Sequence, residues 1–169
     1  EVTDLPADRR ARLGMGYIPQ GRDVFPDLTV HQNITMGLSI SEHKGEKLVD
    51  DVYDYFPRLD ERRDQKAGTM SGGEQQMLAI GRALAGNPDL LLLDEPSEGI
   101  QPSIVQDITD DIASINEEFG VTVLFVEQNL QVIRELAERC YVVDGGRIEA
   151  ELGATDLEDA DAVADYLAV

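Results

Sequence analysis

The sequence predicts an α/β fold with a mostly parallel sheet. Two short apolar runs, residues 90–93 (LLLL) and 121–126 (VTVLFV), are bounded by turn-forming residues. Such runs are typical of strands buried on both faces of a parallel sheet. Between them, residues 104–119 carry apolar side chains at helical spacing and acidic side chains mainly on the other side. Strand and helix therefore alternate, as they do in α/β folds.

The other predicted elements follow from the same patterns, in chain order. Residues 16–19 read as a short strand that ends at a proline, and helices are expected over 31–40, 46–56 and 71–85. Pro102 suits the first turn of the helix before the second apolar run, and Gly120 suits its end. After that run we expect a helix over about 130–138, a strand over 140–143, a hairpin turn at 144–146 leading into 147–152, and a final helix over 156–167.

Composition narrows the possible partners and compartments. The net charge is −20, from 34 acidic and 14 basic residues, so nucleic acid phosphates would repel the chain and a nucleic acid partner is not expected. The acids are spread along the chain, which favours a protein of a salt-loving organism (a halophile) over a chain with one acidic tail. The single cysteine excludes an internal disulfide. With neither a membrane-length apolar run nor a signal-peptide pattern, we expect a soluble, cytoplasmic protein.

The first chemical motif is MSGGEQQ, residues 70–76. Ser71 can cap the helix that follows, with Glu74 three residues on, as in a capping box. Gly72 and Gly73 leave backbone N–H groups uncovered, and a helix start with bare amides attracts anions. An ordinary capped helix is the simpler interpretation if this motif is taken alone.

The second motif is LLLLDEP, residues 90–96. A strand would deliver Asp94 and Glu95 at its carboxyl end, where α/β folds bind ligands. Asp94 can hold a magnesium ion, and Glu95 can orient or deprotonate a water that attacks a phosphate. The alternative is two acids in a loop of a very acidic chain. The order of the motifs argues against it, since the Ser-Gly-Gly helix comes shortly before.

Together the two motifs resemble the ATP-binding-cassette (ABC) ATPase family. MSGGEQQ is similar to its signature motif, with Glu74 where glutamine is often found, and LLLLDEP is similar to its Walker B strand. Gln20 in YIPQ fits the Q-loop glutamine, and residues 97–102 (SEGIQP) fit the D-loop. The resemblance implies a P-loop NTPase-like core with a helical signature subdomain, and ATP and Mg²⁺ as cofactors. It implies that Asp94 and Gln20 serve the metal, that Glu95 is catalytic, and that Ser71, Gly72, Gly73 and Glu74 face the nucleotide.

The chain departs from the family's pattern in two places. Gln128 stands where the family has its switch histidine; a glutamine can donate a hydrogen bond to the γ-phosphate but cannot carry a proton. The resemblance gives Gln128 a catalytic role whose consequence is left open.

The second departure is that no lysine follows a glycine, so the Gly-Lys-Ser/Thr of a phosphate-binding loop is missing. We expect residues 1–169 to be a partial cassette without the N-terminal strands and P-loop, inactive alone, with a helical subdomain at about 28–71 and the remaining motifs in 72–169.

Within the family, GYIPQGRDVFPDLTVHQNI and FVEQN resemble the ATPase subunits of branched-chain amino acid importers, and EGIQPSIVQDI also resembles those of urea importers. This implies a second ATPase subunit, identical or different, permease subunits, an indirectly linked extracytoplasmic binding protein, and a place on the cytoplasmic face of the membrane. The loop at residues 20–28, with Phe25 and Pro26, is expected to contact the permease.

Two alternative functions remain. A DNA-maintenance cassette is disfavoured by the short, heptad-free segment between Gln20 and Ser71, and a non-catalytic interaction module is disfavoured by the retained Asp94 and Glu95.

Overall fold

The computed structural model describes residues 1–40 and 46–158. The chain forms two compact units, Glu1–Val126 and Glu127–Val169. Among the described residues, no helix is both long enough and apolar enough to cross a membrane.

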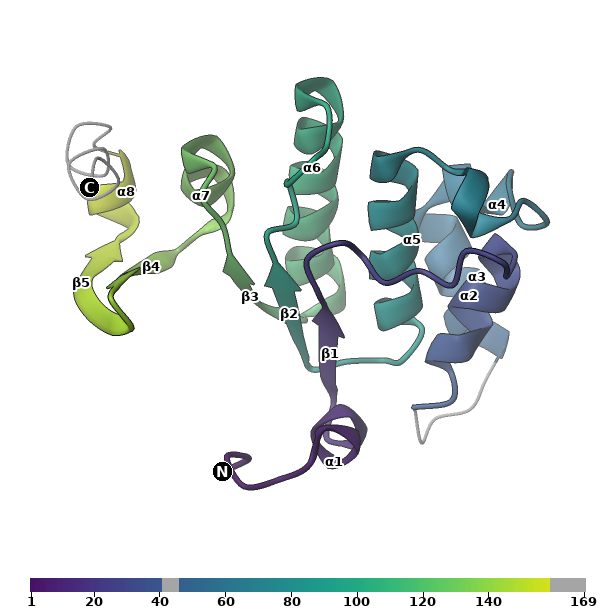
Figure 1. Cartoon of the computed structure of the whole chain (residues 1–169), viewed down its shortest axis with the longest axis horizontal. Helices are drawn as coiled ribbons and strands as arrows, with labels where there is room; N and C mark the ends of the chain where they lie inside the picture. The colour runs from purple at the N-terminus through teal and green to yellow at the C-terminus, as the bar shows by residue number, and fades with distance from the viewer. Residues whose placement is uncertain (41–45, 159–169) are drawn as a thin grey trace. The chain divides into compact units, whose positions relative to one another are not determined.

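A three-stranded parallel sheet lies at the centre of the first unit. Its strands are β1 (Met15–Ile18), β2 (Leu90–Asp94) and β3 (Thr122–Val126), in the order β1-β2-β3 (Figure 1). Leu93 pairs with Ile18 on one side and with Phe125 on the other. The predicted parallel sheet is confirmed, and the three strands end at the same edge.

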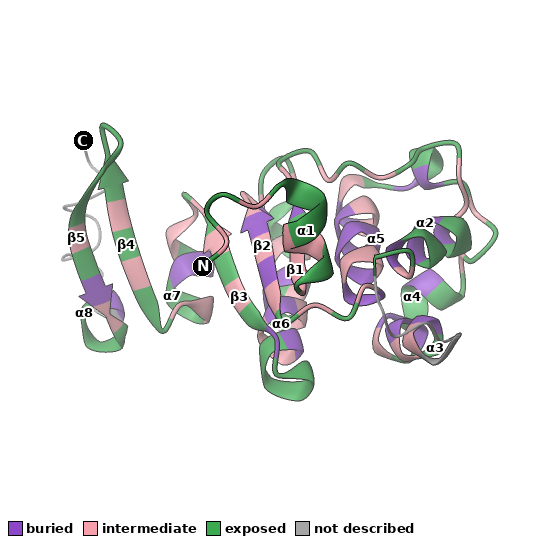
Figure 2. Ribbon diagram, turned by 90° about the horizontal axis from the view of Figure 1, so that it is seen from below, coloured by how far each residue is buried: buried purple, intermediate pink, exposed green. Residues whose placement is uncertain are grey.

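Helices of the first unit connect and cover these strands. Helix α5 (Gly72–Leu84) packs against β1. Helix α6 (Pro102–Phe119) connects β2 to β3 along the chain and packs against α5. Leu91 and Leu93 of β2 are buried, as are Ile108, Ile112 and Ile115 of α6 (Figure 2). The remaining helical elements are α1 (Ala7–Arg12), α2 (Val30–Gly37), α3 (Glu46–Tyr55), α4 (Pro57–Asp60) and the short 3-10 helix η1 (Ala67–Thr69). The helices expected near α2, α3, α5 and α6 are therefore present.

The prediction that residues 121–126 form a strand buried on both faces is wrong. Leu124 is 58 % exposed and Val126 is 61 % exposed, while Val123 and Phe125 between them are half-buried. Side chains of a strand alternate between its faces, and the described residues cover one face of this edge strand better than the other. Tyr17, at 59 % exposed, extends the uncovered face onto β1.

The second unit contains a short helix, a hairpin and another short helix. These are α7 (Leu130–Leu136), β4 (Arg139–Asp144), β5 (Arg147–Gly153) and α8 (Ala154–Glu158). The predicted hairpin is confirmed: β4 and β5 pair antiparallel, and Gly145 and Gly146 both have positive φ, which suits a tight hairpin turn. In the described part of the chain β4 pairs with β5 alone. The helix predicted over 156–167 begins at Ala154, and residues 159–167 lie outside the described residues.

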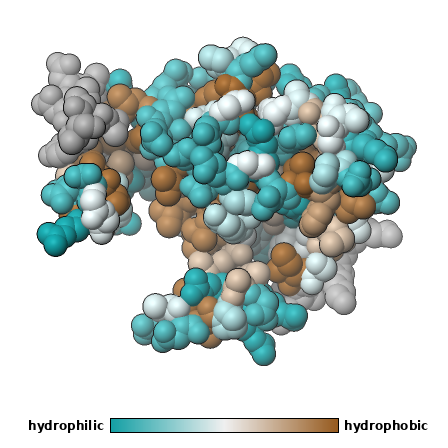
Figure 3. Space-filling view, in the orientation of Figure 1, coloured by the Kyte–Doolittle hydropathy of each residue, from teal (hydrophilic) through white to brown (hydrophobic). Residues whose placement is uncertain are grey.

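The surface of the described residues is mostly hydrophilic on the face that Figure 3 shows. Hydrophilic side chains are spread over the face seen in Figure 3, with apolar residues between them. The exposed large apolar side chains of the described residues include Leu13, Phe25, Met36 and Ile40.

Candidate functional site

The carboxyl edge of the parallel sheet brings two predicted site residues together. Because β1 and β2 run side by side in register, Gln20 and Glu95 both emerge just beyond the paired residues Ile18 and Leu93. The Gln20 amide donates a hydrogen bond from Nε2 to Oε2 of Glu95, at 3.3 Å. The contact joins residues 75 positions apart in the sequence.

Asp94 lies beside the same edge and has its own partner. The Tyr17 hydroxyl donates to Oδ2 of Asp94, at 3.4 Å. Desolvation, followed by the nearby Asp94 carboxylate, raises the pKa of Tyr17. Tyr17 therefore stays a neutral hydrogen-bond donor that steadies the carboxylate.

Glu95 has an unusual backbone conformation. Its φ is +45°, in the left-handed region that costs a residue with a side chain about 1 kcal/mol or more. Two backbone hydrogen bonds hold it: its N–H donates to the carbonyl of Val126 on β3 at 2.9 Å, and its carbonyl accepts from the N–H of Glu98 at 3.1 Å. The surrounding strands therefore impose the direction in which the Glu95 side chain leaves the sheet.

Two residues of the loop after β1 also have a left-handed backbone conformation. Arg22 has a φ of +74° and Asp23 a φ of +46°. Arg82 of α5 donates to both carbonyls, at 2.8 Å to Asp23 and 3.5 Å to Arg22. Burial lowers the pKa of Arg82, which nevertheless remains charged at neutral pH.

Ser71 and Glu74 form the predicted capping box at the start of α5. The Ser71 hydroxyl accepts from the Glu74 N–H at 3.4 Å, and the Glu74 carboxylate accepts from the Ser71 N–H at 2.8 Å. The hydrogen bond from the Ser71 N–H is the main cause that lowers the pKa of Glu74. Arg62 also contacts this carboxylate, at 3.1 Å. The Glu74 side chain is thus engaged by its own helix start.

The two glycines of this helix start have different surroundings. A Cβ on Gly73 would lie 2.4 Å from Cγ2 of Ile104, so α6 packs directly on its backbone. A Cβ on Gly72 would lie 3.3 Å from both terminal nitrogens of Arg22. The same guanidinium donates to the carbonyl of Glu98 at 3.0 Å. Arg22 therefore links the start of α5 to the loop that follows β2.

The structure connects most of the predicted site residues, directly or through neighbouring residues. Gln20 touches Glu95, and the Ser71–Glu74 segment reaches the loop after β2 through Arg22 and Glu98. Gln128 belongs to the second unit, where its N–H donates to the Glu127 carboxylate at 3.1 Å. No group of three or more His, Cys, Asp or Glu residues in the described ranges is arranged to hold a metal.

The sequence patterns did not identify Tyr17, Arg22 or Glu98 as parts of the site. Tyr17 read as a strand residue, and Arg22 and Glu98 as loop residues. The available signal was the position of each: Arg22 follows Gln20, the expected Q-loop glutamine, by two residues, and Glu98 lies within residues 97–102, the expected D-loop.

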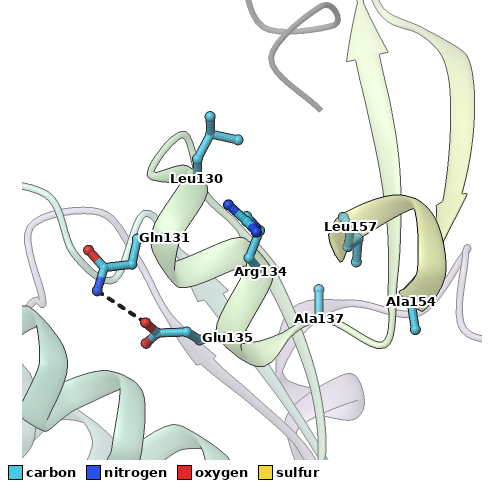
Figure 4. A pocket seen from close by; sticks show the side chains of 7 residues that line it. All are labelled: Leu130, Gln131, Arg134, Glu135, Ala137, Ala154 and Leu157. Atoms are coloured by element: carbon cyan, nitrogen blue, oxygen red, sulfur yellow. Dashed lines mark hydrogen bonds between the residues drawn. The ribbon is translucent and has the colours of Figure 1, made fainter. Parts of the chain in front are cut away.

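A separate cavity of about 610 Å³ lies in the second unit, between α7 and α8 (Figure 4). Gln131 and Glu135 on its wall are hydrogen-bonded to each other at 3.0 Å. No predicted site residue lines it; its walls are Leu130, Gln131, Arg134, Glu135, Ala137, Ala154 and Leu157.

Comparison with known proteins shows the family to which this chain is similar. The family model described as ABC transporter matches residues 1–98. The high-affinity branched-chain amino acid transport ATP-binding protein BraG of Pseudomonas aeruginosa is 50 % identical over 88 % of this chain. The probable branched-chain amino acid transport ATP-binding protein LivF of Archaeoglobus fulgidus is 36 % identical over 93 % of this chain and 67 % of its own length. The lipopolysaccharide export system ATP-binding protein LptB of Escherichia coli is 34 % identical over 93 % of this chain and 66 % of its own. The chain spans 64 % of the length of BraG, less than two thirds.

Solved structures agree with this assignment. An ATP-binding cassette of an ABC transporter superposes with a TM-score of 0.80 at 25 % identity, covering 98 % of this chain and 73 % of that one. A dimeric cassette in a post-hydrolysis state, bound to ADP and Pi, superposes with a TM-score of 0.76 at 27 % identity, covering 89 % and 68 %. The fold of the chain is therefore that of an ABC ATPase cassette.

Proposed function

Because the chain belongs to the ABC transporter family, we propose that it acts within the ATP-hydrolysing subunit of an importer for branched-chain amino acids. The observation that carries the mechanism is the contact between Gln20 and Glu95, which unites the Q-loop and the end of the Walker B strand. The substrate class rests on similarity: 50 % identity with BraG, against 34 % with the lipopolysaccharide export protein of Escherichia coli.

Asp94 and Gln20 fit a magnesium ion that accompanies ATP. Magnesium prefers oxygen ligands and usually takes only one or two from the protein, with phosphates and waters completing its shell. The Asp94 carboxylate and the Gln20 amide oxygen are such ligands, and they lie at one edge of the sheet. The ion would neutralise charge on the phosphates during hydrolysis.

Glu95 is the group that would orient and deprotonate the attacking water. Its carboxylate lies beyond the end of β2, on a backbone fixed by Val126 and Glu98. Strained backbone held by its surroundings is frequent at functional sites, which supports the role. Gln128 would donate its amide to the γ-phosphate, as the family's switch histidine does.

The start of α5 would face the nucleotide of a second cassette. Ser71, Gly72, Gly73 and Glu74 form the first turn of a capped helix, and such a turn offers N–H groups to an anion. Two cassettes would thus share each ATP, with an identical or a different second subunit. We also propose that residues 28–71, approximately, form a helical subdomain; this turn would then lie at its end.

The loop with Phe25 is the proposed contact with the permease. Phe25 is 44 % exposed and lies over the guanidinium of Arg82, at 5.0 Å. The buried Asn33 amide accepts from the Phe25 N–H at 2.9 Å and donates to its carbonyl at 3.0 Å. An apolar side chain on a firmly held loop is suited to a partner surface. This contact would keep the subunit at the cytoplasmic face of the membrane, with the extracytoplasmic binding protein linked through the permease.

A transport assay tests the proposal. The transporter that contains this chain would be purified with its permease and binding protein and placed in vesicles with internal ATP. We expect uptake of leucine, isoleucine or valine that depends on ATP and stops in the Glu95→Gln variant, while Glu61→Gln, an exposed matched control, transports normally. Uptake of urea instead would correct the substrate class, and ATP hydrolysis without any transport of either would remove the importer assignment.

A further inference from the structure

We propose that Glu98 is a positioning residue that ties the loop after β1 to the loop after β2 and fixes which way the Gln20 amide faces. The contact itself stands on the geometry of this chain. Its consequence for ATP hydrolysis rests on the function proposed above.

Glu98 holds the loop after β1 at two points. Its side-chain Oε2 accepts from Nε2 of Gln20 at 2.6 Å, and its main-chain carbonyl accepts from the Arg22 guanidinium at 3.0 Å. Both bonds join residues at least 76 positions apart in the sequence, so they connect separate parts of the site. The Glu98 N–H also donates to the Glu95 carbonyl at 3.1 Å, which sets Glu98 relative to the end of β2.

The hydrogen bonds determine the orientation of the Gln20 amide. Nε2 of Gln20 lies 2.6 Å from Glu98 and 3.3 Å from Glu95. Ionised carboxylates only accept hydrogen bonds, so the amide nitrogen, and not the oxygen, must face both of them. The amide oxygen therefore points away from the two acids. The amide oxygen is the atom that would coordinate a magnesium ion. Because Glu98 accepts the hydrogen bond from the amide nitrogen, it leaves the amide oxygen of Gln20 free to face the ion.

Arg22 extends this connection to α5. Its guanidinium lies against Gly72, and it donates to the carbonyl of Glu98. A chain of contacts thus runs from the first turn of α5 through Arg22 and Glu98 to Gln20 and Glu95. Glu98 contacts three other members, Gln20, Arg22 and Glu95, each with a different atom. It is exposed, so its substitution leaves the core intact.

The first test measures the contact in the 169-residue chain by nuclear magnetic resonance. The side-chain amide signals of Gln20, assigned by their loss in Gln20→Glu, should shift in Glu98→Ala, and their exchange with water should become faster. Glu98→Gln keeps an oxygen that can accept, so its Gln20 signals should stay closer to those of the unmodified chain. Glu117→Ala, an exposed glutamate of α6, is the control. Identical Gln20 signals in Glu98→Ala and the unmodified chain would overturn the proposal.

The second test measures magnesium dependence in the assembled transporter. Losing one hydrogen bond of ordinary strength changes an equilibrium constant by about three- to tenfold. We therefore expect Glu98→Ala to raise the Mg²⁺ concentration for half-maximal ATP hydrolysis by that factor, with Glu98→Gln within about twofold of the unmodified transporter. An unchanged Mg²⁺ requirement in Glu98→Ala would refute the positioning role. If the unmodified transporter hydrolyses no ATP, the proposed function fails, whereas the resonance measurement still decides whether the contact exists.

Discussion

Asn33 is a fully buried polar residue of the first unit, and it determines the shape of the loop that precedes it. Its amide pairs with both backbone groups of Phe25 and donates to the carbonyl of Thr29 at 3.0 Å. With an apolar replacement the Phe25 N–H would lose its partner, whereas the Phe25 carbonyl would keep the Leu28 N–H at 3.2 Å and the Thr29 carbonyl would keep the Asn33 N–H at 2.9 Å. One side chain thus maintains the surface that we propose for the permease.

Asn33→Ala should therefore lower the free energy of unfolding by about 1–3 kcal/mol, because the Phe25 N–H loses its hydrogen-bond partner. Urea unfolding of the unmodified chain and the variant measures the difference. Thr35→Ala, at an exposed position of the same helix, should change it by no more than about 0.5 kcal/mol. Equal stability of Asn33→Ala and the unmodified chain would show that the loop does not depend on this amide.

Asp111 of α6 predicts a pH dependence of stability. Burial, together with the carboxylates of Asp107 and Asp110, raises its pKa to about 6, against an opposing effect of Arg58. The folded chain therefore binds a proton between pH 4 and 6 that the unfolded chain releases, so the contribution of Asp111 to stability is lost as the pH rises through 6. Asp111→Asn should be more stable than the unmodified chain at pH 7, and the difference should shrink toward pH 4. Urea unfolding at several pH values measures it, and a difference that grows as the pH falls would contradict the assignment.

The packing of α5 on α6 depends on the absence of a side chain at Gly73. Gly73→Ala would put a methyl group 2.4 Å from Ile104, so either helix must shift, at a cost of about 1–3 kcal/mol. A Cβ at Gly72 would meet only the guanidinium of Arg22, at 3.3 Å, a long side chain that can shift by a few tenths of an ångström. Alanine favours a helix by up to about 1 kcal/mol over glycine, so Gly72→Ala should be nearly neutral.

Thermal and urea unfolding of the two variants test this packing. Ile104→Ala should recover part of the loss in Gly73→Ala, since it removes the atoms that the new methyl group meets. If Gly72→Ala and Gly73→Ala have equal stability, the packing described here is wrong.

The sequence could predict elements whose signals are local. Apolar runs identified β2 and β3, helical spacing identified α6, and the Ser-x-x-Glu pattern identified the cap of α5. The exposure of Leu124 and Val126 could not be predicted, because an apolar run shows that a strand tends to be buried but not which face is covered. Glu98 and Arg22 were missed for a related reason: each meets a partner at least 76 residues away, and no local pattern specifies such a contact.

For the whole molecule, the net charge of −20 predicts a dependence of stability on salt. Like charges repel each other most in the compact state, and added salt screens them; the Debye length falls from about 10 Å at 0.1 M to about 3 Å at 1 M. The urea midpoint should rise as KCl is increased over this range, with the rise levelling off at the upper end. A midpoint that stays constant or falls would contradict the role of charge repulsion.

Glu95 is proposed to activate water in an ATP-hydrolysing subunit, and the Glu95→Gln variant of the assembled transporter tests this role most directly. Glutamine has nearly the same shape but is not a base, so the variant should bind Mg-ATP as the unmodified transporter does. Its rate of ATP hydrolysis should fall by at least about 100-fold, the lower end of the contribution of a general base. Calorimetry measures the binding and phosphate release measures the rate, with Glu61→Gln as the exposed control. Hydrolysis by Glu95→Gln at close to the unmodified rate would contradict the account.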